Sequence, residues 1–201
     1  MSNHSLDKVQ QKKQDIIRAA NDLFVKQGYH GTSMRQIARA ANIALGGLYN
    51  HFDSKQQVFK QVFLEYHPYH EVIPAMLEAQ GDTAEQVVRD AFERMLTALE
   101  QRPGFMNLMF IEIVEFNSQH INELISELVP VELQIVERVK DLDPGRLKPI
   151  PPMMFIRTFL GMFISYKITD IVLARQAPSE FQDKALEYFI DIYLHGILAD
   201  N

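Results

Sequence analysis

The sequence predicts an all-α protein in which a small N-terminal helix-turn-helix domain precedes a larger helical domain. Apolar residues recur at spacings of three and four along most of the 201 residues, as amphipathic helices require. Strand signals are nearly absent, because the chain has no alternating β-branched run and no Asn-Gly or Asp-Gly hairpin turn. Residues 28–55 read as two short helical segments joined by a tight turn, which is the layout of a helix-turn-helix.

The first helix is expected over about residues 11–27, with Gly28 as its C-cap. Its apolar side chains share one face and include Ile16, Ala19, Ala20, Leu23 and Phe24. Ser33 and Gln36 then form a capping box, in which each side chain can satisfy a free backbone N–H group. The second helix therefore begins after Ser33 and runs to about Ala41.

A turn at Asn42 joins this helix to a third helix over about residues 45–51. Asn adopts positive φ more readily than most non-glycine residues, and such a turn usually needs positive φ. Ala44 has no side-chain acceptor, so the third helix lacks an N-terminal cap. Asp53 or Ser54 caps a fourth helix.

Proline and glycine divide the rest of the chain into helical blocks. The breakers are Pro68, near the end of the fourth helix, then Pro74, Gly81-Asp82, Pro103-Gly104, Pro130, Pro144-Gly145 and the run from Pro149 to Pro152. The blocks between them are expected at about residues 83–101, 105–116, 119–141, 153–175 and 179–199. Pro130 should kink its block or lie near one end of it.

Charge is distributed unevenly along the chain. The net charge of −6 at pH 7 divides into +5 over residues 1–60, which hold nine lysine and arginine residues and four aspartates, and −11 over the remainder. A positive end can contact nucleic-acid phosphates while an acidic body stays away from them. The alternative is that the acidic helices only keep the body in solution, and both explanations can hold together.

Several residues of the N-terminal region occur in a specific order and spacing. They are Phe24-x3-Gly28-Tyr29-x2-Thr32-Ser33-x-Arg35-x-Ile37-Ala38-x2-Ala41, then Gly46-x-Leu48-Tyr49-x-His51-Phe52-x-Ser54-Lys55. This pattern resembles the DNA-binding domain of the TetR family of bacterial regulators over about residues 10–60. Little of residues 61–201 takes part, since that part of the family diverges with the ligand.

The resemblance implies that nine residues bind DNA. Tyr49, His51 and Lys55 match positions that contact phosphate, and Ser33 matches a helix cap that lies against the DNA backbone. Arg35 matches a position that reaches a base or a phosphate. The other four are Leu45, Gly46, Gly47 and Asn50 of the recognition helix, which turns them outward or sideways towards the major groove.

Some positions depart from the family pattern. Asn42 stands where Gly is usual, and the missing cap of the third helix costs about 1 kcal/mol. Gly47 stands where Thr or Ser is common, so a polar contact is lost. We therefore predict sparse direct readout, with thymine-methyl contact by Leu45, base contact by Asn50 and Arg35, and a share of indirect readout.

Each of these residues also has an ordinary structural explanation. Taken alone, Tyr49 could be a core tyrosine, although its neighbour Leu48 already serves that face, and His51 could be a surface histidine. Taken together at this spacing, the residues favour DNA binding.

The two C-terminal blocks suit a dimer interface. Residues 153–166 are apolar nearly all round, as in a helix buried on more than one side. Block 179–199 carries a wide apolar stripe of Phe181, Ala185, Leu186, Phe189, Ile190, Tyr193, Leu194 and Ile197. In the TetR family the last two long helices pair with their twofold mates, which implies a homodimer through about residues 153–199 on a palindromic operator. Gly161 and Ser165 would permit close approach, while the alternative for the stripe is an intrachain core.

A ligand pocket is implied by the resemblance alone. The candidate lining residues are mostly Met and Phe, which suit an apolar, adaptable pocket, and plain core packing is the alternative for each. They are Tyr66, His67, His70, Met106, Met109, Phe110, Phe116, Arg157, Met162, Phe163 and Tyr166. Arg157 needs a partner, either a ligand carboxylate or Glu112 or Glu115. We assign residues 1–55 to DNA binding and residues 56–201 to ligand binding and dimerisation.

Other function classes find little support. His67, His70 and Glu71 invite a metal site, but Pro68 disturbs helical presentation and no second cluster supports it, so neither metal nor cofactor is predicted. No Gly-x-Ser-x-Gly, paired acid/base or phosphate-loop signature indicates an enzyme. The lack of cysteine, a polar first segment and the lack of a bilayer-length apolar stretch predict a cytosolic protein.

The favoured hypothesis is a homodimeric transcriptional repressor that a small apolar or amphipathic ligand releases from its operator. The alternatives are an activator, a regulator without a ligand, and a helical small-molecule binding protein whose helix-turn-helix no longer binds DNA. Salt-dependent DNA binding separates the regulators from the binding protein.

Overall fold

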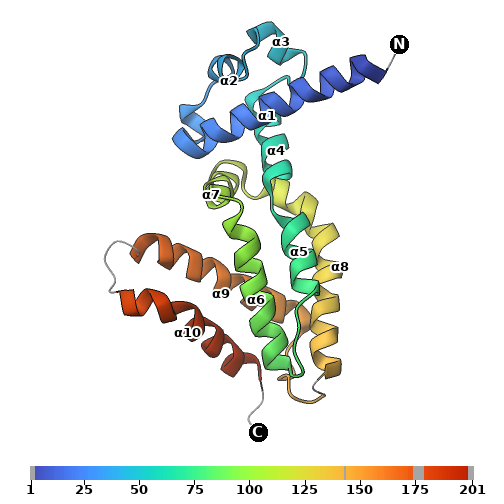
Figure 1. Cartoon of the computed structure of the whole chain (residues 1–201), viewed down its shortest axis with the longest axis vertical. Coiled ribbons are helices and arrows are strands. Elements are labelled where there is room, and N and C mark those ends of the chain that lie inside the picture. The colour runs from blue at the N-terminus through green and yellow to red at the C-terminus, as the bar shows by residue number, and fades with distance from the viewer. Residues whose placement is uncertain (1–2, 143, 174–178, 199–201) are drawn as a thin grey trace. The chain divides into compact units, whose positions relative to one another are not determined.

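The computed structural model describes residues 3–142, 144–173 and 179–198, and within these ranges every regular element is a helix (Figure 1). In chain order the helices are α1 (Asn3–Gly31), α2 (Met34–Ala40), α3 (Leu45–Tyr49), α4 (Lys55–Tyr66), α5 (Tyr69–Leu77), α6 (Ala84–Glu100), α7 (Phe105–Phe116), α8 (Gln119–Leu142), α9 (Pro152–Leu173) and α10 (Ser179–Ile197). The predicted all-α fold is confirmed, and the five expected downstream blocks correspond to α6–α10. The last residues of two blocks, 174–175 and 199, lie outside the described ranges.

The chain forms two compact units. The first consists of residues 1–68 and 99–125, and the second of residues 69–98 and 126–201. Helices α4 and α7 therefore belong with α1–α3, while α6 and α8 each contribute residues to both units. The assignment of functions to residues 1–55 and 56–201 concerns activity rather than packing, and it stays a prediction.

Local sequence signals set the helix ends of the first unit. Gly28 has a φ of 74°, which interrupts the helical path of α1. The capping box before α2 is present, since Gln36 N donates to Ser33 Oγ over 3.3 Å and Ser33 N donates to Gln36 Oε1 over 2.8 Å. Asn42 has a φ of 53°, and Ala44 precedes α3 without a side-chain hydrogen bond. These features agree with the predictions, because each depends on a few neighbouring residues.

An aromatic cluster forms the centre of the first unit. Phe24 of α1 and Phe59 of α4 meet edge to face with ring centroids 5.4 Å apart, and both are fully buried. Phe116 of α7 stacks on Phe59 at 4.7 Å and meets Tyr29 of α1 edge to face at 5.0 Å. Full burial of a Phe side chain contributes about 1.5–3 kcal/mol. The cluster therefore ties α7 to the N-terminal helices.

Two prolines lie inside helices. Pro74 was expected to break the helical pattern, yet α5 runs through it, and this helix was not among the predicted blocks. Pro74 is exposed and removes one backbone hydrogen bond, while burial of Met76 still favours the helix. Pro130 lies well inside α8 rather than near an end of it.

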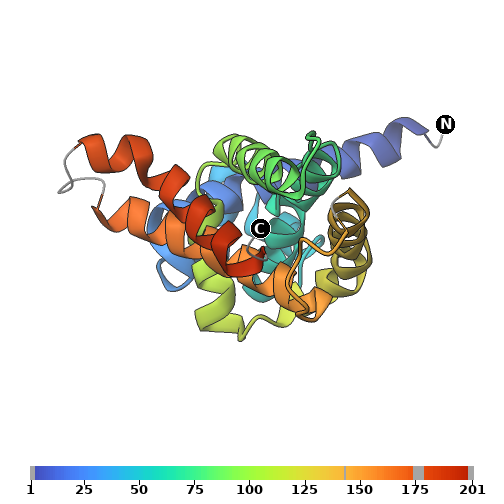
Figure 2. The same ribbon diagram turned by 90° about the horizontal axis from the view of Figure 1, so that it is seen from below.

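Helices α6, α9 and α10 supply much of the core of the second unit. Phe92 of α6 meets Phe159 of α9 edge to face at 5.4 Å, and Phe159 meets Tyr193 of α10 at 5.7 Å. Helices α9 and α10 lie side by side in both views (Figures 1 and 2). Part of the predicted dimer stripe is buried here within the chain, namely Ile190, Tyr193, Leu194 and Ile197. That part of the stripe is intrachain core, which corrects its interpretation as an interface; the side chain of Phe181 lies outside the described residues.

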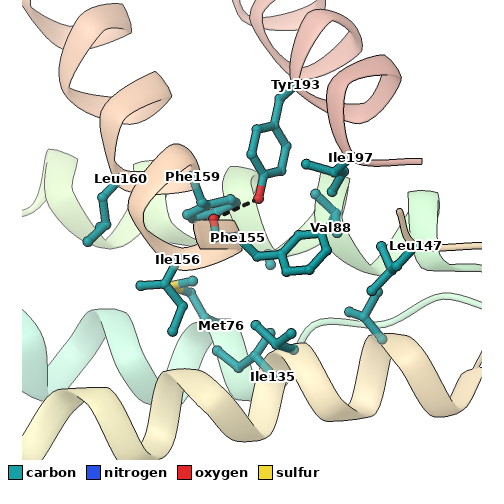
Figure 3. Close-up of a pocket in the computed structure, with 13 residues that line it drawn as sticks. Met76, Val88, Ile135, Leu147, Phe155, Ile156, Phe159, Leu160, Tyr193 and Ile197 are labelled. Atoms are coloured by element: carbon teal, nitrogen blue, oxygen red, sulfur yellow. Dashed lines mark hydrogen bonds between the residues drawn. The ribbon is translucent and has the colours of Figure 1, made fainter. Parts of the chain in front are cut away.

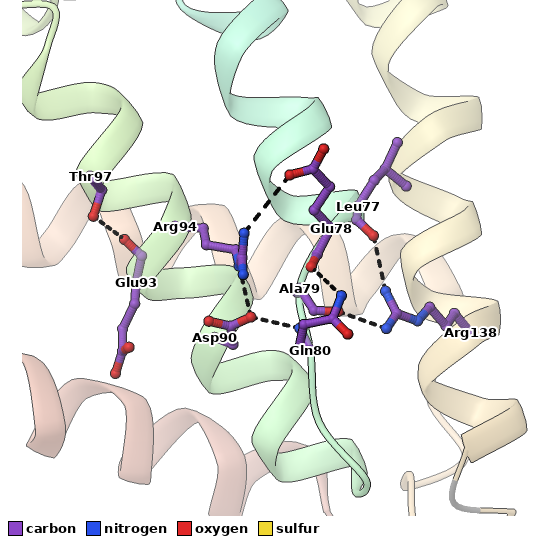
Figure 4. A network of polar contacts seen from close by, with 9 residues as sticks. All are labelled: Leu77, Glu78, Ala79, Gln80, Asp90, Glu93, Arg94, Thr97 and Arg138. Carbon is purple, nitrogen blue, oxygen red and sulfur yellow. Dashed lines mark hydrogen bonds and ion pairs between the residues drawn. The ribbon is translucent and has the colours of Figure 1, made fainter.

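A polar network fixes the turn after α5. Arg138 of α8 donates to the carbonyl oxygens of Leu77 and Ala79 over 2.9 and 2.6 Å (Figure 4). The carboxylate of Asp90 in α6 accepts a hydrogen bond from Gln80 N over 2.6 Å. That bond is the main reason why the pKa of Asp90 lies below its ordinary value. The turn is therefore held to both α6 and α8.

Helices α9 and α10 leave large apolar side chains exposed. They are Met153, Met154, Leu160, Ile164, Ile171, Val172 and Leu173 on α9, and Tyr188 and Ile192 on α10. Gly161 and Ser165 of α9 are also exposed. Within the described ranges, no helix is both long and apolar enough to cross a membrane. Contiguous exposed apolar patches usually mark interaction surfaces.

Candidate DNA interface

Helix α3 turns one side into the core and the other to solvent. Leu48 is fully buried and Phe52, just after the helix, is nearly so. Tyr49 is 49% exposed, and Asn50 is also exposed. Tyr49 is therefore a surface residue rather than a core tyrosine, as the DNA-binding interpretation requires.

Two arginines of α2 lie at an open groove beside the start of α3. The groove is lined by Arg35, Ala38, Arg39, Asn42, Ile43, Ala44 and Leu45. Both arginine side chains are exposed, and Leu45 is half-buried. Arg39 was not among the predicted DNA-binding residues, although its spacing of four from Arg35 places the two on one helix face. The structure thus adds a second cation beside the recognition helix.

The recognition helix α3 is weakly specified by its own sequence. It has five residues, of which two are glycine, and no side-chain cap. A Cβ atom at Gly46 or Gly47 would meet nothing within 4 Å, so packing within the chain does not require either glycine. Each costs about 0.5–1 kcal/mol relative to alanine inside a helix. The bare backbone leaves room for a close approach by DNA.

Two further predicted residues lie at the edges of this surface. Ser33 is exposed, but its hydroxyl is already engaged, since it donates to Gln36 Oε1 over 2.8 Å and accepts from Gln36 N. His51 is half-buried and directly precedes the buried ring of Phe52. Ser33 therefore sets the start of α2, and its side chain is held in place before any DNA arrives.

Lys55 makes contacts inside the protein. Its ammonium donates to the backbone carbonyl oxygens of Tyr29 and Thr32 over 2.7 and 2.8 Å, and it lies 4.0 Å from the centroid of the Tyr29 ring. Partial burial lowers the pKa of this ammonium, while nearby Glu115 acts in the opposite direction. Lys55 thus joins the start of α4, which Ser54 caps, to the end of α1. A phosphate contact by its ammonium would compete with these bonds.

Lys13 lies beside the same surface, although the sequence alone did not single it out. Its ammonium is 5.9 Å from the centroid of the Phe52 ring. Helix α1 therefore brings a cation next to the segment that carries Tyr49 and His51. The single sequence signal for it was the excess of positive charge in residues 1–60.

This helix-turn-helix matches a known family model. Residues 16–62 match the model of bacterial regulatory proteins of the tetR family. The chain carries a TetR-family DNA-binding domain. The match spans α1 from the start of its buried face to α4, and so includes the whole candidate DNA interface except Lys13.

Similarity to known transcriptional regulators extends beyond this domain. The chain is 24% identical to the uncharacterized HTH-type transcriptional regulator YvkB of Bacillus subtilis (strain 168), over 92% of this chain and 96% of YvkB. It is 45% identical over 49 residues to IcaR of Staphylococcus aureus (strain Newman), the HTH-type negative transcriptional regulator of the biofilm operon icaADBC, over 24% of this chain and 26% of IcaR. The crystal structure of NalD, the secondary repressor of the MexAB-OprM multidrug efflux pump in Pseudomonas aeruginosa, superposes with a TM-score of 0.67 at 19% identity, over 97% of this chain and all of NalD. That superposition shows a shared fold.

The second unit contains an apolar cavity of about 60 Å³ (Figure 3). Five helices and the loop before α9 line it, with Met76, Val88, Ala91, Ile135, Val136, Val139, Leu147, Phe155, Ile156, Phe159, Leu160, Tyr193 and Ile197. None of the eleven residues predicted from the sequence to bind a ligand lines this cavity. Periodicity marks a residue as inward-facing, but it does not say which inward faces leave a space between them.

The predicted ligand residues are divided between the two units. Tyr66, His67, Met106, Met109, Phe110 and Phe116 belong to the first, and His70, Arg157, Met162, Phe163 and Tyr166 to the second. Phe116 packs in the aromatic cluster, Phe163 is buried against α6, and Phe110 is 43% exposed. A ligand role for these residues stays a prediction, and plain packing explains Phe116 and Phe163.

Arg157 differs from its predicted pairing. It is exposed on α9, so its charge is hydrated and needs no protein partner. Glu112 instead accepts from His120 Nδ1 over 2.7 Å, and Glu115 pairs with His30 Nε2 at 2.6 Å. The expectation that Arg157 pairs with either glutamate is wrong, because each carboxylate is taken by a histidine.

The two lysines beside the interface should respond differently to substitution. Lys13→Ala removes a cation near phosphate, so the slope of log affinity against log salt should fall by about 0.9 without loss of stability. Lys55→Ala breaks two hydrogen bonds from a charged donor, so the free energy of unfolding should fall by about 1–3 kcal/mol. Filter binding over a salt series and urea unfolding of both variants measure these effects. The assignment of roles fails if Lys55→Ala leaves stability unchanged.

Proposed function

We propose that the protein is a homodimeric transcriptional repressor that binds a palindromic operator through α2 and α3 and is released by a small apolar ligand. The observation that carries the proposal is the exposed surface of the TetR-family domain, with Arg35, Arg39, Tyr49 and Asn50 grouped around the recognition helix. These side chains suit base and phosphate contacts. The negative regulator IcaR and the repressor NalD favour repression over activation.

The exposed apolar surface of α9 and α10 supports the dimer. Met153, Leu160 and Ile164 of α9 recur at intervals of seven and four, which places them on one stripe with Arg157 between them. Gly161 adjoins this stripe, and a Cβ atom there would meet nothing within 4 Å. A partner helix can therefore approach closely at that point. Two copies related by a twofold axis present two recognition helices to two half-sites.

The cavity of the second unit supports a ligand. Met76 of α5 lines it, and α5 follows α4 after His67 and Pro68 alone. A ligand that moves α5 can therefore act on α4 through a two-residue connection. Leu160 also lines the cavity and is 38% exposed on the proposed dimer surface, so filling the cavity can alter the dimer as well. Ligand binding then lowers the affinity for the operator, and operator binding lowers the affinity for the ligand by the same coupling free energy.

Selection of bound sequences from random DNA tests the DNA-binding part of the proposal. The wild-type protein should enrich a palindrome, and its binding should weaken steeply with salt. Leu45→Ala should keep the palindrome but relax the preference at one base step in each half-site, because a thymine-methyl contact is lost. Failure to enrich any sequence would support the alternative of a helical binding protein without DNA function.

A further inference from the structure

Among the residues that the structure describes, none that lines the cavity of the second unit carries a charge. Of the described lining side chains, only that of Tyr193 has a nitrogen or oxygen atom, and its hydroxyl donates to the carbonyl oxygen of Phe155 over 2.9 Å (Figure 3). Burial raises the pKa of Tyr193 to about 12, so this hydroxyl is neutral near pH 7. The one hydrogen that it can donate is therefore already used.

Cations close to the cavity in the sequence are either engaged elsewhere or, like Arg157 after the lining residue Ile156, exposed to solvent. Arg138 lies between the lining residues Val136 and Val139, but its guanidinium donates to Leu77 and Ala79. Lys148 follows the lining residue Leu147, and its ammonium donates to the carbonyl oxygen of His195 over 2.9 Å. An anionic group inside the cavity would lose its hydration without gaining a partner, which carries a large free-energy penalty.

The size and walls of the cavity favour a slim occupant. A volume of about 60 Å³ is well below the roughly 300–1,000 Å³ of typical small-molecule sites. The cavity must therefore widen, and the wall contains one side chain that adapts easily, the flexible Met76. Phe155 and Phe159 are nearly buried and packed, so they resist displacement. A chain of methylene groups needs less widening than a ring or a branched group.

We propose that this cavity binds the unbranched, uncharged hydrocarbon chain of an alkyl or acyl ligand, with any polar head group outside. This inference rests on the proposed function for its biological role, since it names the class of ligand that would release the operator. It narrows the ligand to molecules with a terminal methyl group that can enter the cavity first. Ligands polar at both ends are excluded by the same argument.

Titration calorimetry of the full-length protein with 1-octanol and 1,8-octanediol, in the absence of DNA, tests the site itself. The diol must bury a hydroxyl group at its leading end, so it should bind at least about tenfold more weakly than 1-octanol. Equal affinities, or no binding of 1-octanol, would overturn the proposal. Because no operator is present, either result is independent of the repressor function.

Cavity-filling variants locate the site. Ala91→Val adds two methyl groups at a nearly buried lining position of α6 and should abolish 1-octanol binding. Ala98→Val, on the same helix but outside the lining, should bind as the wild type does. If Ala91→Val fails to fold, Ile135→Phe from α8 should give the same loss. Binding that survives both filling variants would place the alcohol elsewhere and overturn the proposal.

Release of the operator is then measured separately. Adding 1-octanol to the complex of the wild-type protein and its selected operator should weaken DNA binding, and the Ala91→Val protein should not respond. If 1-octanol binds in the cavity but leaves the operator complex unchanged, the hydrocarbon site stands and the ligand-release part of the proposed function fails.

Discussion

Glu112→Ala should lower the free energy of unfolding by about 2–6 kcal/mol, because it leaves two buried donors without an acceptor and each unsatisfied donor costs about 1–3 kcal/mol. Glu112 is fully buried and His120 is 2% exposed. The Glu112 carboxylate accepts from His120 N over 2.6 Å and from His120 Nδ1 over 2.7 Å. Its removal leaves a buried imidazole and a backbone N–H at the start of α8 without acceptors. Urea unfolding followed by circular dichroism measures the loss.

A surface pair provides the control for this prediction. Glu123 and Lys60 form an ion pair at 2.7 Å in the same unit, with side chains 45% and 41% exposed. Glu123→Ala should therefore cost less than about 1 kcal/mol, because exposed pairs contribute little. Glu112→Gln keeps an acceptor and should fall between the two. If Glu112→Ala and Glu123→Ala lower the free energy of unfolding equally, the buried pair contributes no more to stability than the exposed pair, and the prediction is wrong.

Loss of the Glu112 carboxylate should also weaken DNA binding, because the Glu112–His120 pair contacts the aromatic cluster. The ring of His120 lies 5.2 Å from that of Phe116, which stacks on Phe59 of α4. Helix α7 also reaches α1 through the His30–Glu115 pair and through Asn107 Nδ2, which donates to the carbonyl oxygen of Val25 over 3.1 Å. Loss of the buried pair should therefore loosen the packing that fixes α1 and α4, and operator affinity should fall with stability.

The sequence was sufficient for the DNA-binding domain because its signals are local. Gly28, the Ser33–Gln36 box, Asn42 and Ala44 each act within one helix turn, and each has the predicted conformation. Helix periodicity likewise placed α6–α10. The structural role of Lys55 in joining α4 to the end of α1 was not predicted. Its two carbonyl acceptors lie 26 and 23 residues away in the sequence, and sequence spacing does not reveal such a contact.

Beyond this domain, the sequence separated buried from exposed positions less well. Helix α10 has apolar residues on several sides, and the chain buries Ile190 and Tyr193 of the predicted stripe while Tyr188 and Ile192, outside the stripe, are exposed. Which side meets α9 depends on tertiary packing that periodicity does not encode. The cavity depends in the same way on side chains from five helices that fit together imperfectly.

Ile192→Glu should separate the proposed dimer and weaken operator binding by about 10²–10⁴-fold, because a monomer loses the second half-site. Ile192 is 74% exposed, so the substitution removes little packing within the chain and should leave stability unchanged. Across a twofold interface the new carboxylate would meet buried apolar surface or its own symmetry mate, and both are unfavourable. Analytical ultracentrifugation at micromolar concentration should show the wild type as a dimer and the variant as a monomer.

A matched substitution separates the loss of the interface from the effect of added charge. Val114 of α7 is 71% exposed, so Val114→Glu introduces the same charge at the same degree of exposure outside α9 and α10. This control should sediment as a dimer and bind the operator like the wild type, apart from a small repulsion that salt screens. If Ile192→Glu stays dimeric, the outer face of α10 does not form the interface. If it becomes monomeric yet keeps full operator affinity, one recognition helix suffices, and the twofold match between protein and operator is wrong.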